Sequence, residues 1–141
     1  MTTGDVSGSE ADGVLLTNAS RTIFVVDDDD SVRTSLVRLL KSAGHDVVAF
    51  ASAEDFLRDV PEDARGCMVA DVHMAGMSGI ELLQVLLAQN RAIPAIVITA
   101  YEDAETRQAA TDAGVVAFLK KPFDDCLLLE AVSRALQLDR E

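Results

Sequence analysis

The chain has 141 residues, 49% of them hydrophobic, and its 24 acidic and 12 basic side chains give a formal net charge of −12. This length suits one domain with a single hydrophobic core. The acidic balance argues against binding to nucleic acid or to an anionic membrane surface, because both need clustered lysine and arginine side chains. No apolar run is long enough to span a bilayer, and no secretory signal is visible.

The cysteines and histidines form no recognisable binding pattern. Cys67 and Cys126 are far apart, no Cys-x-x-Cys pair is present, and the histidines are His45 and His73. This spacing favours reduced thiols over a disulfide framework or a zinc site. We therefore expect a cytoplasmic protein.

Residues 1–21 differ in composition from the rest of the chain. They are rich in Thr, Gly, Ser, Asp and Glu, and no hydrophobic period is sustained across them. Such a segment buries too little apolar surface to offset the entropy lost on folding. We expect a disordered tail over residues 1–21 and one folded domain over residues 22–141.

Five short apolar runs follow the tail, each about the length of a β-strand. None alternates polar with apolar residues, which is typical of parallel strands covered on both faces. The runs occupy residues 23–26, 47–50, 67–70, 95–98 and 115–119.

Amphipathic helical stretches separate these runs. The first has an apolar stripe and ends at Gly44, a residue suited to a helix C-terminus. The second and third begin at Ser52 with Asp55 and at Ser78 with Glu81, which have the spacing of N-terminal capping boxes.

The fourth helix is expected at about residues 103–113 and the fifth from about residue 124. Five strand–helix units in series predict an α/β fold, a doubly wound five-stranded parallel sheet flanked by five helices. In such a sheet the functional groups lie at the carboxyl ends of the strands.

Those strand ends carry Asp27, Asp28, Asp71, Thr99 and Lys121. Three carboxylates face one ammonium, and two carboxylates about 4 Å apart repel by roughly 4 kcal/mol at an effective dielectric of about 20. Either some of them take up protons or a divalent cation neutralises the cluster. An all-oxygen rim rich in carboxylates suits Mg²⁺ or Mn²⁺.

The same groups fit phosphoryl transfer. Asp71 is the candidate nucleophile, since carboxylates serve this role in aspartyl-phosphate enzymes. Lys121, the Thr99 hydroxyl and the backbone N–H that follows supply donors for the phosphoryl oxygens. We assign Asp29 and Asp30 to the start of the next helix, where capping and helix charge favour acidic residues.

The strand ends carry four segments, VVDD at 25–28, DVHMAGMSG at 71–79, ITA at 98–100 and KPF at 121–123. Together these segments resemble the receiver domain of bacterial two-component response regulators. The resemblance runs from about residue 22 to residue 138. It implies a flavodoxin-like fold with strand order 2-1-3-4-5, and a receiver domain over residues 22–141. The segment FASAEDFL at 50–57 is similar to receivers of nitrogen-fixation regulators that carry a helix-turn-helix output domain.

The resemblance implies a phosphorylation site that depends on a metal. Asp71 would accept a phosphoryl group from a phosphohistidine on a sensor histidine kinase or a phosphotransfer protein. Asp27 and Asp28 would hold Mg²⁺ or Mn²⁺, together with a carboxylate oxygen of Asp71 and the backbone carbonyl of His73. The chain would then be a phosphorelay switch with autophosphatase activity, not a turnover enzyme.

The resemblance also implies roles around the phosphoryl group. Thr99, the Ala100 N–H and Lys121 would bind its oxygens. Phe118 matches the switch aromatic that turns inward when Thr99 moves toward the phosphate, and His73 and Tyr101 would tune hydrolysis. We expect the fourth helix, fifth strand and fifth helix, roughly residues 102–136, to form the surface for a downstream partner or a homodimer.

Two details concern the loops. The Lys121–Pro122 bond is cis in typical receivers, so we expect it to be cis here. Ala75 stands where proline is usual, which removes a φ constraint from the loop after Asp71.

Several alternatives stay open at this stage. The segment DDDSV at 28–32 weakly resembles the first motif of haloacid-dehalogenase-type phosphatases, in which Asp28 would be the nucleophile. A flavodoxin-like carrier shares the topology, but residues 27–30 would repel the FMN phosphate, and an EF-hand needs glycine where Val32 stands. A receiver-like module that works without phosphorylation is a further alternative. The chain is either a stand-alone receiver or part of a longer transcription regulator.

Overall fold

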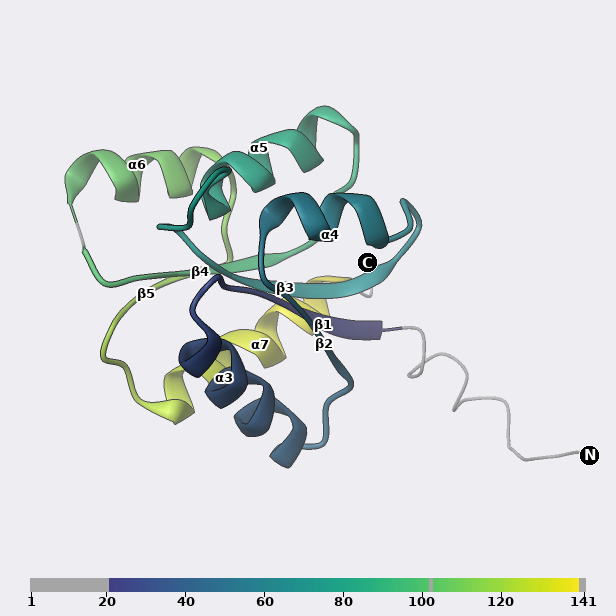
Figure 1. Cartoon of the computed structure of the whole chain (residues 1–141), viewed down its shortest axis with the longest axis vertical. Coiled ribbons are helices and arrows are strands. Elements are labelled where there is room, and N and C mark those ends of the chain that lie inside the picture. The colour runs from purple at the N-terminus through teal and green to yellow at the C-terminus, as the bar shows by residue number, and fades with distance from the viewer. Residues whose placement is uncertain (1–20, 102, 140–141) are drawn as a thin grey trace, which may run out of the picture.

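The computed structural model describes residues 21–101 and 103–139. Its five strands form one parallel sheet in the order β2-β1-β3-β4-β5, and helices alternate with the strands along the chain (Figure 1). The elements are β1 (Arg21–Val26), α3 (Asp30–Ser42), β2 (Val47–Phe50), α4 (Ala53–Asp59), β3 (Arg65–Asp71), α5 (Gly79–Ala88), β4 (Ala95–Thr99), α6 (Ala104–Asp112), β5 (Ala117–Lys120) and α7 (Asp125–Asp139). The predicted doubly wound fold and its strand order are confirmed.

The predicted tail, residues 1–21, lies outside the described residues except for Arg21, which begins β1. Within the described part of the chain, no helix combines the length and the apolar character needed to cross a bilayer.

The sheet separates two hydrophobic clusters. Helices α4, α5 and α6 cover one face, and α3 and α7 cover the other (Figure 1). Successive β1 side chains alternate between the two faces of the sheet, as in any strand. Phe24 and Val26 belong to one cluster, and Ile23 and Val25 belong to the other. Every residue of β4 is buried, as expected for a parallel strand with helices on both sides.

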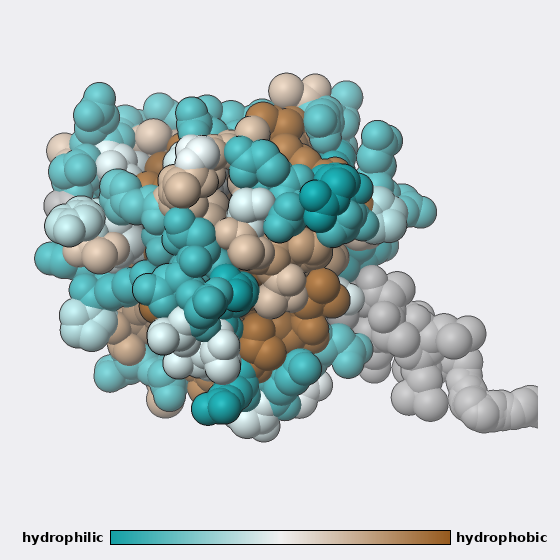
Figure 2. All heavy atoms as spheres, in the orientation of Figure 1, coloured by the Kyte–Doolittle hydropathy of each residue, from teal (hydrophilic) through white to brown (hydrophobic). Residues whose placement is uncertain are grey.

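The two edge strands are less covered than their apolar sequences predict. Val48 in β2 is 47% exposed, and all four residues of β5 are at least partly exposed. In Figure 2 apolar surface gathers where Figure 1 places β2. The expectation of cover on both faces therefore holds for the inner strands and fails at the edges, where a strand has a neighbour on one side alone.

Polar side chains fix where four helices begin. Asp29, Ser52, Ser78 and Asp103 each accept a hydrogen bond from the backbone N–H three residues later. The reciprocal capping box forms at Ser78 and Glu81. Among the described residues, the Ser52 cap has only the bond from the Asp55 N–H, and the Asp55 carboxylate lies 3.2 Å from Arg58.

Candidate functional site

Asp71 is the last residue of β3 and is 7% exposed. Its Oδ1 accepts a hydrogen bond from the His73 N–H at 2.9 Å, and its Oδ2 accepts one from Lys121 Nζ at 3.2 Å. A Cβ on Gly79 would lie 2.4 Å from the Asp71 carbonyl oxygen, so α5 begins directly against this strand end. The Asp71 carboxylate is thus held in place by the His73 N–H and by the Lys121 ammonium.

Asp27 directly follows β1 and is 1% exposed. Its Oδ1 accepts a hydrogen bond from the Asp29 N–H at 2.9 Å. Its Oδ2 is buried, accepts no hydrogen bond from any residue that the structure describes, and lies 4.0 Å from Lys121 Nζ. Burial raises the pKa of Asp27 to about 6; the Asp29 N–H opposes this shift, and the negative charge of Asp71 adds to it.

Asp28 is exposed at the same edge of the sheet, next to Asp27. Its Oδ2 accepts a hydrogen bond from the Ala75 N–H at 2.9 Å. The Asp28 carboxylate is therefore tied to the loop between β3 and α5, and its charge also raises the pKa of Asp27.

Thr99 ends β4 and is fully buried. Its hydroxyl donates to the Tyr101 carbonyl oxygen at 2.7 Å and accepts from the Tyr101 N–H at 3.0 Å. Ala100, between these two residues, is exposed. Tyr101 is 69% exposed, and its ring meets the His73 ring edge to face, with centroids 5.6 Å apart. Thr99 is thus engaged with its own loop, while His73 and Tyr101 flank the same strand ends.

Phe118 lies in β5, next to Val97 of β4, and is partly buried. The Arg107 guanidinium of α6 lies 5.0 Å from the centre of its ring. Phe118 therefore links β5 to α6. Glu102, where the predicted partner surface starts, lies outside the described residues. The Lys121–Pro122 bond is cis, as expected.

The residues present fit a divalent cation bound through oxygen. In the described chain no three carboxylate, imidazole or thiol groups are already gathered as a metal site. However, the buried Asp27 Oδ2 has no donor, and the pKa of this group is raised, so a cation there would stabilise its charged form. Carboxylates and a backbone carbonyl are ligands that Mg²⁺ accepts.

Three contributors escaped sequence analysis. Arg33 Nη1 donates to the Asp27 carbonyl oxygen at 2.9 Å, while its other nitrogen pairs with Asp30. The spacing of Asp30 and Arg33 on one helix face signals that pair, but not the contact with Asp27. The contacts of Ala75 with Asp28 and of Glu54 with Met77 join residues distant in the sequence, and no local pattern signals them.

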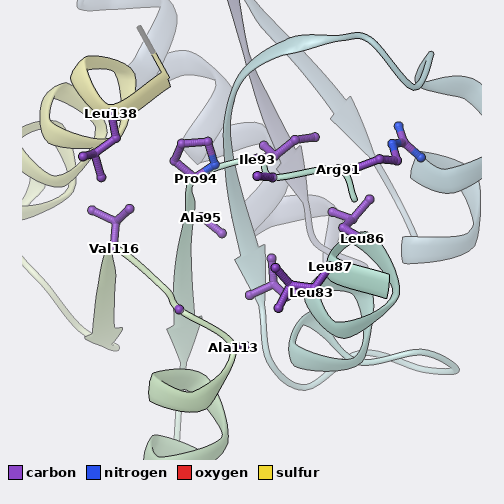
Figure 3. Close-up of a pocket in the computed structure, with 12 residues that line it drawn as sticks. Leu83, Leu86, Leu87, Arg91, Ile93, Pro94, Ala95, Ala113, Val116 and Leu138 are labelled. Atoms are coloured by element: carbon purple, nitrogen blue, oxygen red, sulfur yellow. The ribbon is translucent and has the colours of Figure 1, made fainter. Parts of the chain in front are cut away.

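A cavity of ≈310 Å³ lies away from these groups. Figure 3 shows its apolar lining, which includes Leu83, Pro94, Val116 and Leu138. Pro94 directly precedes β4, so this cavity adjoins the amino ends of the strands, opposite Asp71 and Thr99. The candidate functional site is therefore the polar cluster and not this cavity.

Residues 23–133 match the family model described as response regulator receiver domain. The chain belongs to this family. The resemblance identified in the sequence is confirmed, and this membership favours a receiver over the phosphatase, flavodoxin-like and EF-hand alternatives.

Two curated relatives of this receiver are transcriptional regulatory proteins. TdiR of Thauera aromatica is 46% identical over 124 residues, which cover 88% of this chain and 54% of TdiR. FixJ of Bradyrhizobium diazoefficiens is 41% identical over 115 residues, which cover 82% of this chain and 56% of FixJ. The receiver spans about half the length of the curated relatives it matches.

A crystal structure of FixJ-N superposes on this receiver with a TM-score of 0.78 at 41% sequence identity. The match covers 83% of this chain and 94% of that one. FixJ is thus among the relatives, which agrees with the likeness to nitrogen-fixation regulators predicted from residues 50–57.

Proposed function

We propose that this receiver domain is a signalling switch that is phosphorylated on Asp71 in a reaction dependent on Mg²⁺. The donor is the phosphohistidine of a sensor histidine kinase or a phosphotransfer protein. Family membership supports the receiver role. The observation that carries the chemistry is the pairing of Asp71 Oδ2 with Lys121 Nζ at 3.2 Å. The buried Asp27 Oδ2 lies 4.0 Å from the same ammonium and accepts no hydrogen bond from the described residues.

The proposed step is a transfer between two side chains. A carboxylate oxygen of Asp71 attacks phosphorus, the phosphorus–nitrogen bond of the phosphohistidine breaks, and the donor imidazole keeps that electron pair. Bound Mg²⁺, held by Asp27, Asp28, Asp71 and the His73 carbonyl, would neutralise charge on the phosphoryl oxygens. Lys121 supplies the second positive charge. Later attack by water on the acyl phosphate returns the carboxylate and releases phosphate, so the chain is reset without turning over a substrate.

The proposed response starts at Thr99. A phosphoryl group on Asp71 offers new acceptor oxygens, which favour the Thr99 hydroxyl, the Ala100 N–H and the Lys121 ammonium close to it. Thr99 then leaves its bonds with Tyr101, and Phe118 moves into the space. His73 and Tyr101, whose rings meet at the rim, govern the access of water and hence the lifetime of the acyl phosphate.

The output surface is proposed to be α6, β5 and α7. This surface contains Phe118 and Arg107, so a movement of the ring changes it directly. Its partner is a second copy of the chain or a downstream protein. The proposed location is the cytoplasm, where sensor kinases present their phosphohistidine.

Intact-protein mass spectrometry after incubation with acetyl phosphate tests the proposal. We expect one added phosphoryl group with Mg²⁺ present and none after chelation, while Asp71→Asn takes up none under either condition. Uptake independent of metal, or equal uptake by Asp71→Asn, would contradict it. A wild-type chain that never takes up phosphate would favour a module that works without phosphorylation.

A further inference from the structure

The loop between β3 and α5 is held by three carboxylates in a regular pattern. The backbone N–H groups of His73, Ala75 and Met77 donate to Asp71 at 2.9 Å, to Asp28 at 2.9 Å and to Glu54 at 3.1 Å, respectively. Alternate amides of one short segment thus each have a carboxylate acceptor from a different part of the chain: the end of β3, the loop between β1 and α3, and α4. The first two acceptors belong to the candidate site, whereas Glu54 comes from α4.

The glycine within this loop lets Glu54 approach. Gly76 has φ +79°, which disfavours any residue with a side chain, and a Cβ there would lie 3.0 Å from Glu54 Oε2. At the end of the loop, Gly79 is packed against the Asp71 carbonyl. The Glu54 carboxylate therefore lies close to the Gly76 backbone and also accepts the hydrogen bond from the Met77 N–H.

The central bond depends on the identity of residue 75. Proline has no N–H, so it could not donate to Asp28. With alanine, the loop lacks the φ constraint that proline would impose, and hydrogen bonds at either side of Gly76 determine its position instead. The His73 carbonyl and the Asp28 carboxylate are both attached to this loop.

We propose that Glu54 is a positioning residue for the metal site. By accepting from the Met77 N–H, Glu54 fixes the loop at residues 73–77 and so orients the His73 carbonyl and the Asp28 carboxylate toward the cation. This inference rests on the proposed function, because those oxygens are ligands only if the site binds Mg²⁺. Groups that orient metal ligands from behind affect affinity although they never touch the metal.

Two measurements on the full chain test this role. NMR hydrogen exchange without metal reports the Met77 amide, and a Mg²⁺ titration followed by backbone amide shifts reports affinity. For Glu54→Ala we expect Met77 exchange about 10-fold faster and Mg²⁺ affinity about 10-fold lower. Glu54→Gln keeps an acceptor oxygen, so both effects should be smaller.

The variants separate geometry from charge. Glu54→Ala and Glu54→Gln remove the same charge, so a difference between them reports the hydrogen bond. Glu62→Ala removes one charge from an exposed position near Arg65 and Asn90, at the opposite edge of the sheet, and should match the wild type in both measurements. A circular dichroism melt confirms that each variant is folded.

The Mg²⁺ affinities of wild type and the variants decide whether Glu54 positions the metal ligands. If wild type binds Mg²⁺ and Glu54→Ala binds it equally well, Glu54 has no positioning role, although the proposed function stands. Equal loss of affinity in Glu54→Ala, Glu54→Gln and Glu62→Ala would show that charge alone matters, which also overturns the inference. A wild-type chain that does not respond to Mg²⁺ would overturn the proposed function with it.

Discussion

Asp27 is a buried carboxylate whose negative charge lowers the stability of the metal-free fold. Its carboxyl group is 1% exposed, one of its oxygens accepts no hydrogen bond within the described part of the chain, and its pKa is raised to about 6 from 3.8. Each pKa unit corresponds to about 1.4 kcal/mol, so the ionised group costs the metal-free fold up to about 3 kcal/mol near pH 7. A bound cation offsets that cost, which couples metal binding to stability.

The sign of the pH dependence follows from this shift. Between about pH 4 and pH 6 the folded, metal-free chain holds a proton on Asp27 that the unfolded chain has released, so stability falls as pH rises. We predict that Asp27→Asn increases the unfolding free energy at pH 7 by up to about 3 kcal/mol and flattens its pH dependence in this range. Urea denaturation in the presence of EDTA measures both.

Magnesium supplies the control for this prediction. Mg²⁺ should increase the unfolding free energy of wild type and leave that of Asp27→Asn nearly unchanged. The difference in stability between the two proteins should therefore become smaller. If Asp27→Asn is less stable than wild type without metal, the buried charge of Asp27 does not destabilise the metal-free fold, which contradicts the prediction.

At the level of elements, β1 and β3 approach more closely than a side chain allows at one point. Gly66 of β3 pairs with Thr22 of β1, and a Cβ on Gly66, whose φ is +140°, would lie 1.8 Å from the Thr22 carbonyl oxygen. We predict that Gly66→Ala lowers the unfolding free energy by more than about 3 kcal/mol, as measured by chemical denaturation.

Gly44 provides a matched comparison. It also has a positive φ, +93°, but a Cβ there would meet nothing within 4 Å. Gly44→Ala should therefore cost only the backbone strain, about 1–2 kcal/mol. Equal losses at the two positions would show that the close approach to Thr22 does not determine stability.

The link between β5 and α6 makes a prediction about signalling. Phe118 lies under Arg107 and is proposed to move after phosphorylation. We predict that Phe118→Ala takes up phosphate at a rate within about 2-fold of wild type, because β4 lies between β5 and the strand that carries Asp71. The variant should lose any change in self-association. Phosphate uptake and size-exclusion elution, measured on the same sample, test the two predictions. If Phe118→Ala also lost phosphate uptake, Phe118 would be needed for phosphorylation itself and not only for the change in self-association.

The sequence predicts the elements well where a local cause acts. Apolar runs place the inner strands, and polar caps such as Ser78 and Asp103 place the helix starts. It fails for Asp55, whose short side chain pairs with Arg58, and for exposed Val48, because edge position depends on strand order. The acidic residues of the site can be predicted because they stand at the ends of predicted strands. The contact of Glu54 with Met77 depends on how α4 packs, and no local sequence pattern indicates it.

For the whole molecule, we predict a change in self-association or partner binding on activation. Beryllofluoride with Mg²⁺ mimics the phosphoryl group on an aspartate, so it should change the elution volume of wild type or its binding to a partner. Asp71→Asn should not respond, because its side chain lacks the negative oxygen that coordinates beryllium. If neither self-association nor partner binding changes in wild type, the surface formed by α6, β5 and α7 is not the output surface.

The central claim is that one carboxylate among the three at the strand ends receives the phosphoryl group. Borohydride reduction of the acyl phosphate, followed by peptide mass spectrometry, identifies that residue directly. We predict that the modification maps to Asp71 alone and appears only when Mg²⁺ or Mn²⁺ is present. A label on Asp28, or one that forms on Asp71 without a divalent cation, would contradict it.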